Sequence, residues 1–219
     1  MGSMGFAMGD DSPFPLVKSI FDAWGSGDHS YLRETAASYQ FKLAGSEGSL
    51  TARRAKLGPP DLLPLLQDAA ASAAPAAPAA EQGILEQLRA HAPVLHWFST
   101  RGTDASCVVV GPSANAPLAA SNMLLGFLYL GPHSSYPAHA HASTGAFHVV
   151  AGRCVTLRAG GRPVARAAGD VVVRAAGEVQ SLETADSAVL ICWVNSGELV
   201  GQHHFVGDDS AGGSARSKL

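Results

Sequence analysis

The 219 residues are enough for one domain of moderate size with an extension, or for two small units. The formal net charge is −3, from 15 basic and 18 acidic residues without a basic stripe, which argues against binding to nucleic acid. No apolar run reaches the roughly 20 residues of a membrane span, and the three cysteines form no CxxC pair, which favours a reducing compartment.

The N-terminal part of the chain is predicted to be helical. Residues 1–12 are expected to be a disordered leader, and residues 13–97 a helical segment with an Ala/Pro-rich linker near residues 73–80. Four stretches within this segment predict short helices, the first two from apolar side chains at helical spacing: Phe14–Trp24, Ser30–Leu43, Leu62–Ala71 and Glu81–Ala92.

The second part of the chain is typical of short strands. Six stretches are rich in Val, Leu, Ile and aromatic residues: Cys107–Val110, Met123–Leu130, Pro137–Val150, Cys154–Arg158, Val171–Arg174 and Ala188–Val194. Turn signals such as Gly152-Arg153 and Gly169-Asp170 separate them. Short strands at this spacing predict an all-β sandwich or barrel, which we place over residues 98–207, followed by a flexible tail over residues 208–219.

Residues with useful chemistry concentrate in the run Tyr136-Pro137-Ala138-His139-Ala140-His141. Side chains of a strand alternate with a period of two, so His139 and His141 are expected to face the same side. In a barrel that turns this face inward, the two imidazoles point toward one place and form half of a metal site. The same alternation turns His148 away from the interior. The alternative for His139 and His141 is a structural role, as histidines hydrogen-bonded inside the barrel.

The order and spacing of several motifs are similar to those of the cupin family of dimethylsulfoniopropionate (DMSP) lyases, over roughly residues 95–207. The motifs, in chain order, are Val108-Val109-Val110-Gly111-Pro112, Leu124–Leu130, Tyr136–His141, Phe147 with Ala151-Gly152, Gly169-Asp170-Val171-Val172 with Thr184, and Cys192–Gly197. The resemblance implies a mainly β fold, a cupin double-stranded β-helix barrel with an α-helical N-terminal segment.

The resemblance also implies a carbon–sulfur lyase. In that family a divalent metal ion, for which we expect iron, zinc, manganese or nickel, holds the substrate's carboxylate. A tyrosine removes the proton from the adjacent carbon, dimethyl sulfide leaves and acrylate remains. A cation at the carboxylate stabilises the enolate-like charge that develops, and a phenol near a metal can act as a base at neutral pH. His139 and His141 match the family's two histidines, and Tyr136 matches its motif tyrosine.

Three positions depart from the family pattern. The family's glutamate ligand falls at Gly145, its strand tyrosine at Phe147, and its second-motif histidine at or near Gln180. An amide oxygen binds transition metals less well than an imidazole does, so a metal site in this chain has to be rebuilt from other residues. The candidates for such a site are His139, His141, Gln180, Glu178 and Glu183 as metal ligands and Tyr136 and Tyr129 as catalytic bases.

Two other functions stay open. A non-catalytic or repurposed cupin would bind a small carboxylate or sulfonium ligand without a metal. A cupin of different chemistry, such as a dioxygenase or an isomerase, would use the two histidines with a substituted ligand. In each case the expected partner is a small molecule, with no nucleic acid and no membrane, and a homodimer is the default for a cupin barrel.

The tripeptide Ser217-Lys218-Leu219 matches a peroxisomal address. We therefore expect the protein to be bound by the peroxisomal import receptor and to reside in the peroxisome of a eukaryote. Without this signal, the cytoplasm is the expected location.

Overall fold

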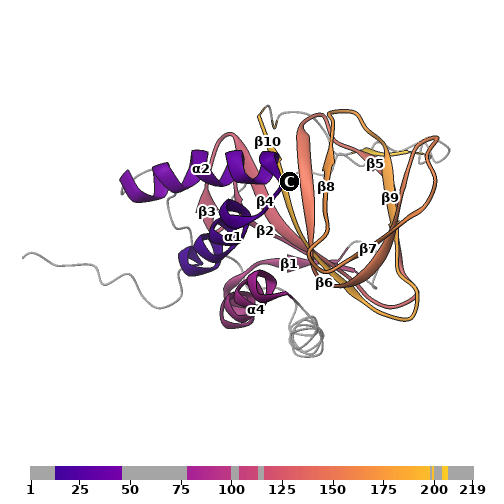
Figure 1. Ribbon diagram of the computed structural model, residues 1–219, viewed down its shortest axis with the longest axis horizontal. Helices are drawn as coiled ribbons and strands as arrows, with labels where there is room; N and C mark the ends of the chain where they lie inside the picture. Colours follow the sequence, from indigo (N-terminus) through magenta and orange to yellow (C-terminus); the bar gives the residue numbers. More distant parts are fainter. Residues whose placement is uncertain are drawn as a thin grey trace, which may run out of the picture.

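A computed structural model gives the fold (Figure 1) and describes residues 13–45, 78–99, 104–112, 116–197, 199 and 204–206. Several sequence predictions lie outside the described residues. They are the leader of residues 1–12, the helix Leu62–Ala71, most of the linker near residues 73–80, and the tail of residues 208–219 with its tripeptide Ser217-Lys218-Leu219.

Helices make up the N-terminal part that the structure describes. They are α1 (Phe14–Ser26), α2 (Ser30–Gly45), α4 (Ala79–His91) and the short 3-10 helix η2 (Ala92–Val94). Three of the predicted helices are thus confirmed to within a few residues, and α4 begins inside the predicted linker. Helix α1 buries Leu16, Ile20 and Trp24, which recur every four residues and form one apolar face. In the part of the chain that the structure describes, no helix is long and apolar enough to cross a membrane.

Eleven strands in the described part form one curled sheet. They are β1 (Trp97–Phe98), β2 (Asp104–Gly111), β3 (Leu118–Ala119), β4 (Met123–Leu130), β5 (Ser135–Ala140), β6 (Thr144–Arg158), β7 (Val164–Ala167), β8 (Val171–Arg174), β9 (Gln180–Glu183), β10 (Val189–Ser196) and β11 (His204–Phe205). The strand order is β1-β2-β4-β10-β6-β9-β5-β11, with β3 beside β2 and both β7 and β8 beside β6. The pairs are antiparallel except for β2 with β3.

The long strand β6 belongs to both halves of the curled sheet, on the right in Figure 1. Its first half pairs with β8 and β10, and its second half pairs with β7 and β9. Gly152 lies between the two halves with φ of 79°, and a Cβ atom there would collide with the carbonyl oxygen of Ala188.

Two sequence predictions about this region are wrong. The turn predicted at Gly152-Arg153 is instead a bend within one continuous strand, because the positive φ of Gly152 accommodates an irregularity without ending the pairing. The stretch Pro137–Val150, predicted as one unit, is divided between β5 and β6.

Alternation along the strands creates two apolar cores. One core lies between the sheet and the helices and contains Leu16, Ile20 and Trp24 of α1 with Ala146 and Val150 of β6. The other lies inside the curl, where both halves of the sheet contribute: Leu128, Leu130, Phe147, Val149, Cys154, Val172, Leu182, Val189 and Ile191. The architecture is therefore the predicted mainly β barrel with a helical N-terminal segment, and its inward face is where the candidate residues have to be sought.

Candidate functional site

The inward positions of the barrel change from apolar to polar toward one end. Three polar residues lie an even number of positions from interior residues of the same strand, and they therefore face inward too. They are Gln180 on the strand of Leu182, Arg174 on that of Val172 and Asn195 on that of Ile191. Together with the two motif histidines, these residues form what we call the interior polar layer: His139, His141, Arg174, Gln180 and Asn195. Cross-strand pairing connects the layer, because His139 lies opposite Gln180, and Gly145 lies opposite both Arg174 and Asn195.

His139 and His141 lie side by side. Their ring centroids are 5.3 Å apart, with the ring planes at 84°. The Nδ1 atom of His139 is 2.8 Å from the carbonyl oxygen of Pro137. A carbonyl can only accept a hydrogen bond, so Nδ1 carries a proton, and in the neutral imidazole Nε2 then carries the lone pair. This is the orientation in which a second hydrogen bond prepares a histidine for a metal. The metal-ligand role of both histidines stays a prediction.

Tyr136 is brought to the same place by an irregularity in β5. Residues three apart normally face opposite sides of a strand, but a register shift between Tyr136 and His139 places both opposite inward residues of β9, Leu182 and Gln180. The rings of Tyr136 and His139 meet edge to face, with centroids 4.9 Å apart. Phe205 of β11 packs on both rings. The motif tyrosine therefore lies in contact with His139, the first of the motif histidines.

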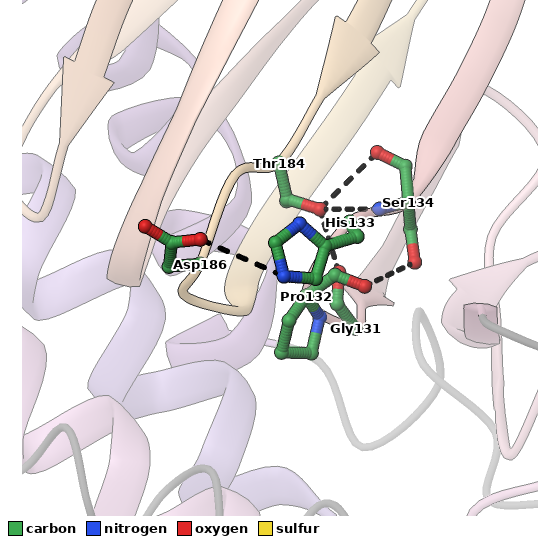
Figure 2. Close-up of polar contacts among 6 residues, drawn as sticks. All are labelled: Gly131, Pro132, His133, Ser134, Thr184 and Asp186. Carbon is green, nitrogen blue, oxygen red and sulfur yellow. Dashed lines mark hydrogen bonds and ion pairs between the residues drawn. The ribbon is translucent and has the colours of Figure 1, made fainter.

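A network around Thr184 fixes the loop that leads into β5 (Figure 2). The Thr184 hydroxyl lies 2.6 Å from the carbonyl oxygen of Gly131 and accepts a hydrogen bond from the backbone N–H of Ser134 at 2.9 Å. His133, with φ of 54°, lies 3.6 Å from Asp186 on the exposed side of this loop. Thr184 thus anchors the start of the strand that carries Tyr136 and His139 and that leads into His141.

Gln180 has a buried acceptor that the protein does not satisfy. The residue is 3% exposed, and its Oε1 atom has no hydrogen-bond partner among the described residues. Because an unpaired buried acceptor loses its hydration without compensation, this atom is suited to a ligand or an ion beside His139. Two imidazole nitrogens and one amide oxygen fit a divalent ion, although no group of three His, Cys, Asp or Glu side chains is assembled in the described ranges.

The space beside the Cα atom of Gly145 is filled by neighbouring atoms. A Cβ atom at this position would collide with Oδ1 of Asn195 and would lie 2.7 Å from the carbonyl oxygen of Val194 and 3.0 Å from Nη2 of Arg174. Arg174 donates a hydrogen bond from Nη2 to Oδ1 of Asn195. This pair therefore occupies the space where the resemblance to the DMSP lyases places a glutamate ligand.

Arg174 is a buried cation at the edge of the layer. It is 4% exposed, and burial lowers the pKa of its guanidinium to about 10, an effect that Tyr31, Glu178 and Tyr136 partly oppose. Sequence reasoning missed both Arg174 and Asn195. The alternation of Arg174 with Val172 was the available signal, once Val172 is known to face inward.

Three candidates lie away from the layer and are corrected here. Tyr129 belongs to the core on the helix side, and burial raises the pKa of its phenol, which disfavours a base. Glu178 lies in the turn after β8 and pairs with Arg158 at 2.9 Å. Glu183 is exposed and follows the inward Leu182, so it faces outward.

Phe147 and His148 show the two faces of β6. Phe147 lies in the interior core opposite Val172 and Trp193, and it carries no hydroxyl. His148 faces the helices, as the alternation predicts. Its Nδ1 accepts a hydrogen bond from Nε1 of Trp24 at 3.2 Å, and its Nε2 donates to Oε1 of Glu81 at 2.7 Å.

Comparison with known proteins agrees with the fold. The family model for dimethylsulfoniopropionate lyase matches residues 49–191, which is more than half of the chain. The fold is similar to a crystal structure reported for the DMSP lyases RdDddP and RnDddQII, with a TM-score of 0.70, 17% identity, and coverage of 89% of this chain and 97% of the other. It is also similar to DMSP lyase DddQ from Ruegeria pomeroyi DSS-3, with a TM-score of 0.64, 18% identity, and coverage of 80% and 95%.

No curated protein matches the sequence. The family match and the cupin-type barrel nevertheless agree with the motifs of the sequence. The chain belongs to the dimethylsulfoniopropionate lyase family.

Proposed function

We propose that the protein is a carbon–sulfur lyase that eliminates dimethyl sulfide from DMSP and leaves acrylate. The observation that carries the proposal is the grouping of Tyr136, His139 and His141 inside the barrel of a chain of this family. A phenol beside two imidazoles provides the base and the nitrogen ligands that such an elimination uses.

His139, His141 and Oε1 of Gln180 are the atoms that would hold a divalent ion. When bound, this ion supplies a positive charge that stabilises the negative charge developing on the substrate as its α-proton leaves. The hydrogen bond from His139 to Pro137 holds the imidazole in the required tautomer and orientation.

Tyr136 is the proposed base. As the phenolate, it takes the α-proton onto its hydroxyl oxygen. The electron pair of the broken C–H bond forms the double bond of acrylate, and the C–S bond breaks with its electron pair on sulfur. A sulfonium is already a good leaving group, so this step requires no acid. Phe205 packs against the Tyr136 ring, with ring centroids 5.9 Å apart.

A second candidate is a non-catalytic cupin that binds a small carboxylate or sulfonium compound. Gly145 and Phe147 favour this alternative, because they remove a carboxylate ligand and a hydroxyl that the family pattern contains. Catalysis of dimethyl sulfide release separates the two candidates.

The test is dimethyl sulfide in the headspace over purified full-length protein and DMSP, with iron, manganese, zinc or nickel added in turn. We expect metal-dependent release, and loss of this release to background in the double variant His139→Ala, His141→Ala. The matched control is His133→Asn, which removes an exposed imidazole of the loop before β5 and retains a residue that tolerates positive φ.

The control should release dimethyl sulfide at the wild-type rate. Absence of release with every metal would contradict the lyase and favour the binding protein. Equal release from the double variant would contradict the role of the two histidines.

A further inference from the structure

Arg174 has no counter-ion in the part of the chain that the structure describes. It is the last residue of β8 and lies opposite Gly145 inside the barrel. Its Nη2 donates to the neutral amide oxygen of Asn195, and its Nε has no hydrogen-bond partner among the described residues. The nearby acid Glu178 is held by Arg158 at 2.9 Å and by the backbone N–H of Ala175 at 3.0 Å.

A buried guanidinium without an anion is costly, because the charge loses its hydration and gains only partial compensation from a neutral amide. The charged and titratable groups that influence Arg174 are Tyr31, Glu178 and Tyr136, and none of them forms an ion pair with it. An anion that enters the interior polar layer would therefore offset the free-energy cost of burying the Arg174 charge.

The local geometry prepares Arg174 for a planar anion. Asn195 orients the guanidinium, and the missing side chain of Gly145 gives it room. A carboxylate accepts hydrogen bonds from a guanidinium along a fork of N–H groups, and the Nε–H of Arg174 is available for such a bond. Tyr136, His141 and Trp193 are half-buried, so solvent reaches the inward face close to the layer.

We propose that Arg174 binds the carboxylate of the substrate inside the barrel, as the resident cation that recognises a small carboxylic acid. The proposal rests on the proposed function and deepens it, since DMSP and acrylate both carry a carboxylate. It follows that carboxylate binding does not depend on a metal ion, and that Arg174 lies close enough to Tyr136 for the α-carbon to reach the base.

The test is isothermal titration of the full-length protein, freed of metal with EDTA, with DMSP, with acrylate and with acrylamide, the uncharged analogue of acrylate. We expect the wild type to bind DMSP and acrylate and to bind acrylamide at least about tenfold more weakly, because a hydrogen bond to a charged group is lost. Arg174→Gln should weaken acrylate binding at least about tenfold, and Arg174→Lys should restore it in part. The matched control is Arg153→Gln on the exposed face of β6, which should bind as the wild type does.

Thermal unfolding of each variant establishes that it is folded before titration, and Arg174→Lys retains the charge should Arg174→Gln not fold. The proposal is overturned if the metal-free wild type does not bind acrylate, if acrylamide binds equally well, or if Arg174→Gln binds acrylate like the wild type. The two proposals fail separately. If acrylate binds through Arg174 but no dimethyl sulfide is released, only the lyase activity is contradicted. If Arg174→Gln releases dimethyl sulfide with an unchanged KM for DMSP, only the carboxylate site is contradicted.

Discussion

At the scale of single residues, Gly145 and its neighbours show how a ligand position can be closed. The carbonyl oxygen of Val194 and the amide of Asn195 approach the position so closely that even a Cβ atom would displace them. Restoring a glutamate at residue 145 would therefore not restore a metal ligand, because the space is occupied by the Arg174–Asn195 pair.

We expect Gly145→Glu to lower the free energy of unfolding by about 1–3 kcal/mol, as overpacking of a filled interior does. Urea denaturation measures this loss. Thr144→Glu is the control, since it adds the same carboxylate at the exposed neighbouring residue. Equal stability of the two variants would show that the interior has room at residue 145.

At the scale of elements, His148 connects α1 and α4 to β6. Trp24 can only donate from its indole N–H, so Nδ1 of His148 is the acceptor and the proton lies on Nε2, facing Glu81. Burial raises the pKa of Glu81, but the hydrogen bond from Nε2 of His148, together with a backbone hydrogen bond, outweighs this, and the pKa lies below its usual 4.5. The contact between Glu81 and His148 therefore stabilises the fold fully at pH values above the pKa of Glu81 in the unfolded chain. This stabilisation is lost as the pH falls through the lower pKa of Glu81 in the folded protein.

We expect Glu81→Gln to remove part of the acid sensitivity of the wild type. The stability of the wild type should fall as the pH drops below about 4.5, and that of Glu81→Gln should fall less over the same window. Thermal unfolding between pH 3 and pH 7 checks this, with Glu86→Gln on the exposed face of α4 as the control. The same pH dependence in all three proteins would contradict the role of the contact.

At the scale of the whole molecule, the two cores share strands and should unfold together. Cys107 and Cys192 lie in the core on the helix side, and Cys154 lies inside the barrel. All three thiols are buried, and burial raises the pKa of each, that of Cys154 to about 11, so they should not react with a thiol reagent in the folded protein.

We expect the three thiols to become reactive over the same range of urea concentration. Cys154→Ala should reduce the number of reacting thiols from three to two. It should shift the urea midpoint of unfolding only by the amount that the loss of a small core side chain explains. Ellman's reagent, followed across the transition, measures this. Reaction of Cys154 at clearly lower urea would show that the barrel opens before the helix-side core.

The sequence predicted what depends on regular geometry and missed what depends on irregular geometry. His139 lies in β5 and His141 directly follows its last residue, so their shared face followed from the period of a strand. The position of Tyr136 on that face depends on a register shift that no residue type announces. Tyr129 was placed wrongly because β4 is buried almost throughout and shows no alternation from which its inward face can be read.

Arg174 was missed for a different reason. A charged residue at the end of a Val-rich strand is ordinarily a surface residue, and only the pairing with Gly145 reveals that this one points into the barrel. The absence of a side chain at Gly145 is visible in the sequence, whereas the residue that takes its space is visible only in the fold.

The shared strand β6 also limits how this chain can change over evolutionary time. Between Ala146 and Val150, successive residues face the helix-side core and the barrel interior in turn. An insertion or deletion of one residue there would move the Phe147 ring toward the helices and the His148 imidazole into the barrel, and would disrupt both environments at once. Related sequences are therefore expected to vary in this segment by substitution at constant length, and to place gaps in loops such as the exposed turn around Gly160.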